Sequence, residues 1–372
     1  MRIAEIAPLI EAVPPRLYGG TERVVSWLTE ELVQQGHDVH LFASGDSVTT
    51  ATLHPVVPRA LRLAGIRDHV ASTLVMLNEV RNRASEFDIL HFHIDVLQYP
   101  LFQHLFHKSM TTLHGRLDLI DFHPIYRTFP EMPLISISDR QRAPMPPSNW
   151  ISTIHHGLPQ NMYKFHPRAG SYLAFLGRVC PEKRLDRAIE IAKRSGVPLK
   201  IAAKVDAVDE AYFNGQIKPL LGHPLIEFIG EINDRQKEAF LGDALALLFP
   251  IDWPEPFGLV MIESMAVGTP VIAWRNGSVP EIIENGRTGI IVDSINQAVH
   301  AVEAVMDFDR PSIRARFESR FTATRMASRY VAAFKQVVRD KLASPDKELA
   351  PAAVPALPLQ TIETDRSKLT LA

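Results

Sequence analysis

Short apolar segments alternate with helical segments along most of this chain. Each apolar segment has the length and composition of a buried strand. The first half contains such segments at residues 2–8, 39–43, 89–92, 110–113 and 134–137. The second half contains them at residues 172–176, 199–202, 226–229, 246–249, 271–273 and 290–292. The alternation predicts parallel sheets with helices on their faces, and therefore an α/β fold that binds ligands at the carboxyl ends of its strands.

The length of the chain predicts two sheets, each with its own core. At 372 residues the chain is long for one hydrophobic core, and 46% of its residues are hydrophobic. We expect one Rossmann-like domain over residues 1–165 and a second over residues 166–320. A long helix is expected over residues 321–343. The proline-punctuated residues 344–372 are expected to form a disordered tail.

The charge balance gives no support for a nucleic-acid partner. Lys and Arg total 40 against 42 Asp and Glu, for a net charge of -2, so the chain has no overall positive field. The same balance leaves peripheral membrane contact open without supporting it. A single cysteine, Cys180, cannot form an intrachain disulfide, and the sequence shows neither an amino-terminal signal region nor a long apolar span. We therefore expect a soluble, cytoplasmic protein.

Two glutamates frame an apolar run at residues 255–263 (EPFGLVMIE). Glu255 falls in the loop after a strand, whereas Glu263 falls inside the helix that follows this loop. At this spacing, two glutamates in an arbitrary chain are usually a loop acid and a helix-surface acid. A carboxylate at this edge makes sense if Glu255 binds hydroxyls of a sugar and Glu263 binds other hydroxyls of the same ligand. Backbone N–H groups between them are offered by Phe257, Gly258 and Leu259.

A second strand, loop and helix upstream favours the binding interpretation. Residues 175–184 (FLGRVCPEKR) follow a strand and precede a helix. Gly177 lets the backbone approach a ligand, while Arg178 and Lys183 can both reach a diphosphate from this one loop. Basic residues before a helix are often only solvated. The paired glutamates farther along the chain make that simpler reading less convincing here.

The first half of the chain carries weaker signals. Gly19 and Gly20 come just before the first helix, where the backbone can approach a phosphate or an acceptor at the positive end of the helix dipole. His91 and His93 lie two apart on a strand and are followed by Asp95, a pattern that also suits a metal ion. The sequence offers no convincing third ligand. We therefore predict no metal site.

Together these segments resemble the retaining glycosyltransferases of family 4, which have the GT-B fold. Besides the two motifs above, the likeness rests on residues 268–273 (GTPVIA), 277–283 (GSVPEII) and 285–293 (NGRTGIIVD). It covers about residues 1–340 and is most specific in the carboxyl-terminal half. The resemblance implies two Rossmann-like domains with a central cleft, and a last helix that crosses back onto the first domain.

The resemblance also implies roles for the candidate residues of the second domain. Arg178 and Lys183 would meet the charge that builds on the departing nucleoside diphosphate. Glu255 would hold and orient the transferred sugar, and Glu263 would hold the ribose hydroxyls. Gly177 and the residues between the two glutamates would line the donor site.

In the first domain, His114 at the end of a strand resembles the histidine that faces the transferred sugar. Gly19 and Gly20 would line the donor-phosphate and acceptor side of the cleft. The pair His91 and His93 is not a metal site in this family, whose enzymes need no bound divalent cation. No cofactor is expected, because the nucleotide sugar is a substrate.

The activity implied by the resemblance is metal-independent transfer of a hexose from a UDP or GDP sugar to an acceptor hydroxyl, with retained anomeric configuration. The acceptor is left open among saccharides, lipid-linked molecules and small molecules. One alternative is a sugar-nucleotide epimerase or a phosphorolytic enzyme of the same fold. Another is a catalytically silent nucleotide-sugar-binding protein, against which the presence of Arg178, Lys183, Glu255 and His114 speaks.

Overall fold

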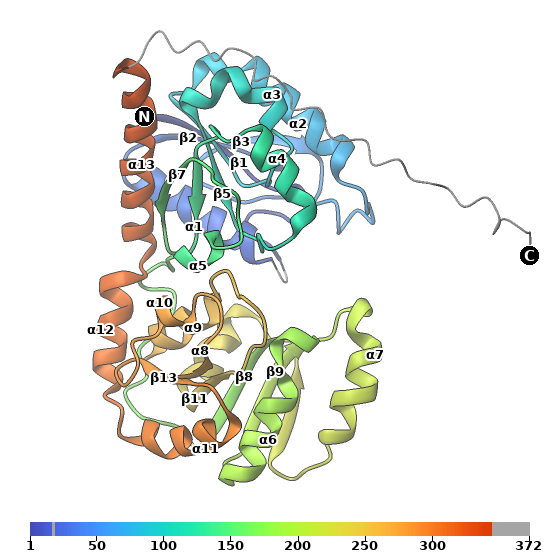
Figure 1. The fold of residues 1–372 in the computed structure, drawn as a ribbon, viewed down its shortest axis with the longest axis vertical. Helices are drawn as coiled ribbons and strands as arrows, with labels where there is room; N and C mark the ends of the chain where they lie inside the picture. Colours follow the sequence, from blue (N-terminus) through green and yellow to red (C-terminus); the bar gives the residue numbers. More distant parts are fainter. Residues whose placement is uncertain (17–18, 344–372) are drawn as a thin grey trace, which may run out of the picture.

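The computed structural model describes residues 1–16 and 19–343, and these form two parallel β-sheets flanked by helices (Figure 1). The tail predicted at residues 344–372 lies outside the described residues. The predicted α/β class with two Rossmann-like sheets is confirmed.

The first sheet has seven parallel strands in the order β3-β2-β1-β4-β5-β6-β7. These strands are β1 (Arg2–Ile6), β2 (Asp38–Ser44), β3 (Thr52–Val57), β4 (Ile89–Phe92), β5 (Ser109–Leu113), β6 (Leu134–Ser136) and β7 (Trp150–Thr153). Its α-helices are α1 (Gly20–Gln34), α2 (Val70–Asn82), α3 (Tyr99–Phe102), α4 (His123–Thr128) and α5 (Asp139–Arg142).

The second sheet has six parallel strands in the order β10-β9-β8-β11-β12-β13. These strands are β8 (Tyr172–Arg178), β9 (Leu199–Lys204), β10 (Ile226–Gly230), β11 (Ala244–Phe249), β12 (Val271–Trp274) and β13 (Gly289–Val292). The remaining α-helices are α6 (Leu185–Ser195), α7 (Glu210–Tyr212), α8 (Asp234–Gly242), α9 (Leu259–Val267), α10 (Val279–Ile282), α11 (Ile295–Ala304), α12 (Arg310–Arg320) and α13 (Ala323–Ala343).

The two edge strands of the first sheet were not predicted. β3 contains Pro55, and an edge strand tolerates a proline because one side of its backbone has no strand partner. β7 is four residues long and follows a proline-rich segment, so its sequence resembles a boundary more than a strand. Both strands are too short or too interrupted to show the alternation on which sequence-based assignment depends.

Helix α1 starts at Gly20, with Gly19 as its N-cap, whereas Thr21 is the residue that its sequence favours as a cap. The apolar stripe of the helix is buried against the first sheet and includes Val24, Leu28 and Leu32. Burial of this stripe stabilises the helix more than one side-chain cap does, since most helical stability in a protein comes from packing.

Helix α13 lies along the first sheet, although it follows the second sheet in the sequence (Figure 1). The Tyr330 hydroxyl lies 3.1 Å from Oγ1 of Thr112 in β5, and the Arg329 guanidinium donates to the carbonyl of Thr153 at 2.6 Å. Met326, Tyr330 and Phe334 are buried. Helix α13 therefore connects the second sheet back to the first, in addition to the segment between β7 and β8.

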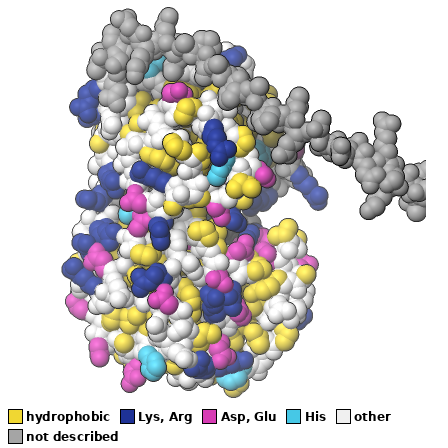
Figure 2. Space-filling view, in the orientation of Figure 1, with side chains coloured by type: hydrophobic (Ala, Val, Ile, Leu, Met, Phe, Trp, Pro, Cys, Tyr) yellow, Lys and Arg dark blue, Asp and Glu magenta, His cyan; other side chains and the backbone are white. Residues whose placement is uncertain are grey.

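The described helices do not include one that is both long and apolar enough to cross a membrane. On the face drawn in Figure 2, acidic and basic side chains are interspersed over both halves of the molecule.

Candidate active site

A cavity of about 660 Å³ lies between the carboxyl ends of the two sheets. Residues from both halves of the chain form its walls. All of the predicted site residues line it: Gly19, Gly20, His114, Gly177, Arg178, Lys183, Glu255, Phe257, Gly258, Leu259 and Glu263. The structure therefore brings together side chains that are up to 244 positions apart in the sequence (Gly19 to Glu263).

The position of the cavity follows from the strand order. In each sheet the chain starts in the middle, builds to one side and then crosses to the other, so that β1 pairs with β4 and β8 pairs with β11. At such a switch point the loops after the two strands diverge and leave a crevice. Glu5, His91 and His93 lie at or just beyond the first switch point. At the second, Arg178 is the last residue of β8 and Glu255 lies beyond β11.

Glu255 and Lys183 form an ion pair on the wall of the cavity. The indole N–H of Trp253 donates to the same carboxylate oxygen of Glu255 at 2.9 Å. The Lys183 ammonium also lies 5.3 Å from the centre of the Trp253 ring and 5.4 Å from that of Phe249, which are cation–π distances. These contacts hold the carboxylate and the ammonium side by side at one point of the wall.

The loop that carries Glu255 is held in place by the GSVPEII segment. Gly277 has φ +52°, and a Cβ atom there would lie 2.3 Å from the Glu255 carbonyl oxygen. The next residue, Ser278, donates its N–H to the Glu255 carbonyl at 3.0 Å and its hydroxyl to the Phe257 carbonyl at 2.7 Å. A glycine is therefore required for the close approach that fixes the loop.

Helix α9 begins at the wall of the cavity. Its N-cap, Gly258, adopts a left-handed conformation with φ +79°, and a Cβ there would lie 2.9 Å from the Met261 side chain and 3.0 Å from Phe249. The first-turn N–H groups of a helix have no partner within the helix. Leu259 and Val260, in that first turn, line the cavity.

Glu263 lies deeper in α9 and is 3% exposed. It accepts a hydrogen bond at 3.0 Å from Lys237 of α8, which also lies 3.3 Å from Asp234. Burial alone would lower the pKa of Lys237, but the carboxylates of Glu263 and Asp234 raise it. Lys237 lines the cavity and was not predicted, although the Asn233 and Gln236 capping box marks the start of its helix in the sequence.

The Arg178 guanidinium lies beside two carboxylates that the sequence did not suggest. Its closest atoms are 3.4 Å from Asp209 and 3.8 Å from Asp206, in the segment after β9. Arg178 lines the cavity at the end of β8, yet its charge is partly balanced by these acids, unlike a free cation ready for a diphosphate.

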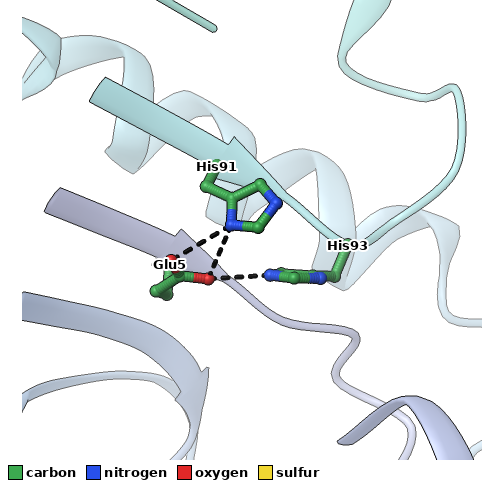
Figure 3. Close-up of side chains that lie close together, drawn as sticks. All are labelled: Glu5, His91 and His93. Atoms are coloured by element: carbon green, nitrogen blue, oxygen red, sulfur yellow. Dashed lines mark hydrogen bonds and ion pairs between the residues drawn. The ribbon is translucent and has the colours of Figure 1, made fainter. Parts of the chain in front are cut away.

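The first switch point carries a buried cluster of histidines around Glu5 (Figure 3). Nδ1 of His91 lies 3.1 and 3.0 Å from the two Glu5 oxygens, and Nε2 of His93 lies 2.7 Å from Oε2. Their ligand-type atoms all lie within 4.8 Å of one another. The expectation that His91 and His93 lack a third partner was therefore wrong, because Glu5 comes from a neighbouring strand 86 positions away in the sequence. Asp95, the acid next to them in the sequence, is not part of this group.

His114 connects this cluster to the cavity. Its Nε2 lies 2.8 Å from Nδ1 of His93, and its ring stacks on that of His156 with centres 5.3 Å apart. The His156 ring in turn meets Phe257 edge-on at 4.8 Å. Burial lowers the pKa of His114 well below its usual value and that of His156 to about 3. His156 also lines the cavity and was missed, because it follows a short edge strand that was not recognised.

Gly19 and Gly20 line the cavity at the start of α1. A Cβ at Gly19 would lie 2.8 Å from the Pro15 side chain, so only glycine fits there without a shift. Three residues later, Arg23 of α1 forms an ion pair with Asp234 of α8 across the two halves of the molecule.

Two family models match this chain in stretches that overlap at residues 164–176. Residues 18–176 match the family described as Glycosyltransferase Family 4, and residues 164–319 match the family described as Glycosyl transferases group 1. The phosphatidyl-myo-inositol mannosyltransferase of Mycolicibacterium smegmatis is 25% identical over 357 residues, covering 86% of this chain and 88% of that protein. The D-inositol 3-phosphate glycosyltransferase of Streptomyces scabiei is 29% identical over 193 residues, covering 45% of this chain and 42% of that protein.

Solved structures share the fold at low sequence identity. AviGT4, a glycosyltransferase involved in avilamycin A biosynthesis, has a TM-score of 0.70 at 20% identity and covers 91% of this chain and 98% of its own. Anabaena HepE in complex with UDP and glucose has a TM-score of 0.66 at 15% identity and covers 90% of this chain and 99% of its own.

Proposed function

Because this chain belongs to the family 4 glycosyltransferases, which have the GT-B fold, we propose that it transfers a hexose from a nucleoside diphosphate sugar to an acceptor hydroxyl with retention of the anomeric configuration. The observation that carries the proposal is the pairing of Lys183 with Glu255 on the cavity wall, with Glu263 deeper in the same cavity. This wall offers a cation for a leaving phosphate and a carboxylate for sugar hydroxyls next to each other.

The electrostatic part of the reaction falls to the second half of the site. Departure of the nucleoside diphosphate builds negative charge on the leaving oxygen, and Lys183, Arg178 and the first N–H groups of α9 are the groups that would meet it. A unit charge pair at 4 Å contributes roughly 4 kcal/mol at an effective dielectric constant near 20. This electrostatic energy is large enough to stabilise the charge of the leaving phosphate in place of a metal ion. The proposed reaction is therefore metal-independent and needs no cofactor.

The sugar and the nucleoside are assigned to different glutamates. Glu255, beside Lys183, would hold the hydroxyls of the transferred hexose, and Glu263, beside Lys237, would hold the ribose hydroxyls. The donor is proposed to be a UDP or GDP hexose, and the acceptor a saccharide, a lipid-linked molecule or a small molecule. The proposed class is supported by the two relatives described above, a mannosyltransferase and an inositol phosphate glycosyltransferase, and by the UDP and glucose bound to HepE.

The proposal is tested first with a panel of nucleotide sugars, measuring release of the nucleoside diphosphate with and without added acceptors. We expect turnover with one or a few UDP or GDP hexoses. Proton NMR of the nascent product then reports the anomeric coupling constant, which should match that of the donor. An inverted product would overturn the retaining mechanism together with the role given to Glu255, because inversion requires a base on the acceptor side.

A further inference from the structure

A continuous series of hydrogen bonds leads from Glu5 to the cavity. Nε2 of His93 is 2.7 Å from the Glu5 carboxylate, and Nδ1 of His93 is 2.8 Å from Nε2 of His114. Glu5 and His93 are 0% and 3% exposed, and His114 lines the cavity. Each ring nitrogen in these two bonds either donates its proton to its partner or accepts one from it. The protonation state of Glu5 therefore determines the proton position on His93, and His93 then determines that on His114.

The Glu5 end fixes the direction of the first bond. An ionised carboxylate only accepts hydrogen bonds, so the two ring nitrogens that face it, in His91 and His93, must both carry protons. Burial alone would raise the pKa of Glu5, but the charge of His91 and hydrogen bonds from both histidines lower it to about 2. Glu5 is therefore ionised at neutral pH, and His93 is protonated on Nε2.

The proton position on His93 determines which ring donates in the hydrogen bond between His93 and His114. Burial and the neighbouring His91 lower the pKa of His93 to about 4, so at neutral pH its ring carries only the one proton, on Nε2. Nδ1 of His93 is then bare and can only accept, which requires His114 to donate from Nε2. Burial and the rings of His93 and His156 lower the pKa of His114 as well, so its other nitrogen, Nδ1, is bare.

Nδ1 of His114 is buried and has no hydrogen-bond partner among residues 1–16 and 19–343. Nε2 is already engaged, so Nδ1 is the ring nitrogen that His114 has left to offer, and the residue lines the cavity. We propose that Glu5 and His93 are positioning residues that hold His114 in the Nε2-protonated tautomer, so that its Nδ1 lone pair accepts a hydrogen bond from a hydroxyl of the donor sugar.

This inference rests on the proposed function for the identity of the ligand, but the tautomer itself does not depend on it. The role of Nδ1 of His114 as a hydrogen-bond acceptor also affects which ligands the site recognises. A bare ring nitrogen accepts from a hydroxyl, whereas it repels a carboxylate or another acceptor at the same place, because a buried acceptor that faces an acceptor is left unpaired. The site therefore selects for a hydroxyl-bearing, uncharged sugar at this point.

The tautomer can be read directly from the full-length protein labelled with ¹⁵N in its histidine rings. Two-bond ¹H–¹⁵N correlation spectra at pH 7 should show His114 protonated on Nε2 and unprotonated on Nδ1, with His93 in the same tautomer. Signals are assigned by their loss in His114→Gln and His93→Phe. A His114 ring that is protonated on Nδ1, or that is a cation, would overturn the proposal whether or not any donor is turned over.

The effect on catalysis is tested by a matched pair of variants, His93→Phe and His91→Phe. Both histidines are buried and both donate to Glu5, but only His93 touches His114. We expect His93→Phe to lower kcat roughly tenfold to a hundredfold, the scale of one lost hydrogen bond to a buried group, with nucleoside diphosphate affinity unchanged. His91→Phe should lower kcat less than His93→Phe does, since it removes one of the two bonds to Glu5 but leaves both bonds of His93 intact. Equal losses in the two variants, or a loss confined to nucleotide affinity, would contradict a positioning role for His93.

Discussion

The two switch points of the molecule have the same topology but opposite chemistry. At the second, between β8 and β11, the cavity wall carries charges in pairs, Lys183 with Glu255 and Lys237 with Glu263. At the first, between β1 and β4, one buried carboxylate, Glu5, holds the neutral ring of His93, which contacts the cavity-lining residue His114. This chain therefore builds the two halves of its cavity from the same kind of sheet edge.

The difference follows from what each half has to do. Charged pairs can exchange a protein partner for a phosphate or a hydroxyl, because each group keeps its charge when the pair separates. A neutral ring with a fixed tautomer offers direction but no charge, which suits recognition of one hydroxyl. We therefore expect substitutions at the second switch point to affect the chemical step most strongly, and those at the first to act through orientation.

The largest expected effect is the loss of Lys183. Lys183→Ala should lower turnover by roughly two to three powers of ten, the scale measured when one donor that stabilises transition-state charge is removed. Steady-state kinetics with the accepted donor would measure it. Arg178→Ala is expected to fall in the same range, and to approach its lower end because Asp206 and Asp209 already balance part of its charge.

Lys200 provides a matched control in the same domain. It lies on β9, pairs with Glu227 and contacts the Tyr172 ring, and it is not among the residues that line the cavity. Lys200→Ala should leave turnover within a few-fold of the parent. If Lys183→Ala, correctly folded, behaved like Lys200→Ala, the charged half of the comparison would be wrong.

A smaller effect should separate the two glutamates of the charged half. Glu255→Gln should lower turnover about tenfold to a hundredfold with little change in nucleoside diphosphate affinity, because an amide forms weaker hydrogen bonds to sugar hydroxyls than a carboxylate does. Glu263→Gln should instead weaken nucleoside diphosphate binding by about tenfold, measured by calorimetry. Each variant is the control for the other. The same pattern of effects in both would contradict the assignment of Glu255 to the sugar and Glu263 to the nucleoside.

The charged half could be predicted from the sequence because its residues are close along the chain. Arg178 and Lys183 share one loop, and Glu255 and Glu263 share one loop and helix, so their spacing carries the signal. The alternation of strands and helices likewise predicted both sheets. It did not predict the edge strands β3 and β7, because their short or proline-interrupted sequences lack a clear pattern.

The histidine half could be predicted only in fragments. His91 and His93 were visible as a pair, and His114 was suggested by resemblance, but Glu5 lies on a different strand and reads in the sequence as one polar residue in an apolar run. Its role depends on the register that sets Glu5 of β1 opposite His91 of β4. Register between strands that are distant along the chain is set by the packing of the whole sheet, so the local pattern of one sequence does not reveal it.

Acid should destabilise the protein through the histidine half. The pKa of His93 is about 4 in the folded protein against 6.5 for an ordinary histidine, so between these values the unfolded chain binds more protons and stability falls as the pH falls. The contribution of Glu5 is present above its ordinary pKa of 4.5 and is lost only as the pH falls towards 2. Between pH 6.5 and 4.5, the pH dependence of stability in this cluster therefore comes from the histidines and not from Glu5.

In that window, His93→Phe should reduce the dependence of the unfolding free energy on pH by up to about 1.4 kcal/mol per pH unit, the value for one proton. Urea unfolding at several pH values measures it. His104→Gln is the control, since His104 is an exposed residue away from this cluster. An unchanged slope in His93→Phe would mean that His93 is not held neutral by the fold.

The smallest expected effect is that of chelation, which should leave turnover unchanged. Glu5, His91 and His93 have the geometry of three metal ligands, so the prediction depends on which atoms carry protons. A metal ion binds the bare lone pair of an imidazole. If one were bound to Nε2 of His93, the ring proton would move to Nδ1, and His93 would donate to His114 instead of accepting from it. His114 would then be protonated on Nδ1 and would present a donor to the cavity, which reverses the polarity inferred for this half of the site. Activity that is lost in EDTA and restored by magnesium or manganese would contradict the metal-independent reaction. Restoration by zinc alone would also contradict the histidine half of the comparison, because imidazole ligands suit zinc. Unchanged turnover across chelator and added cations is expected if Glu5 accepts two N–H groups.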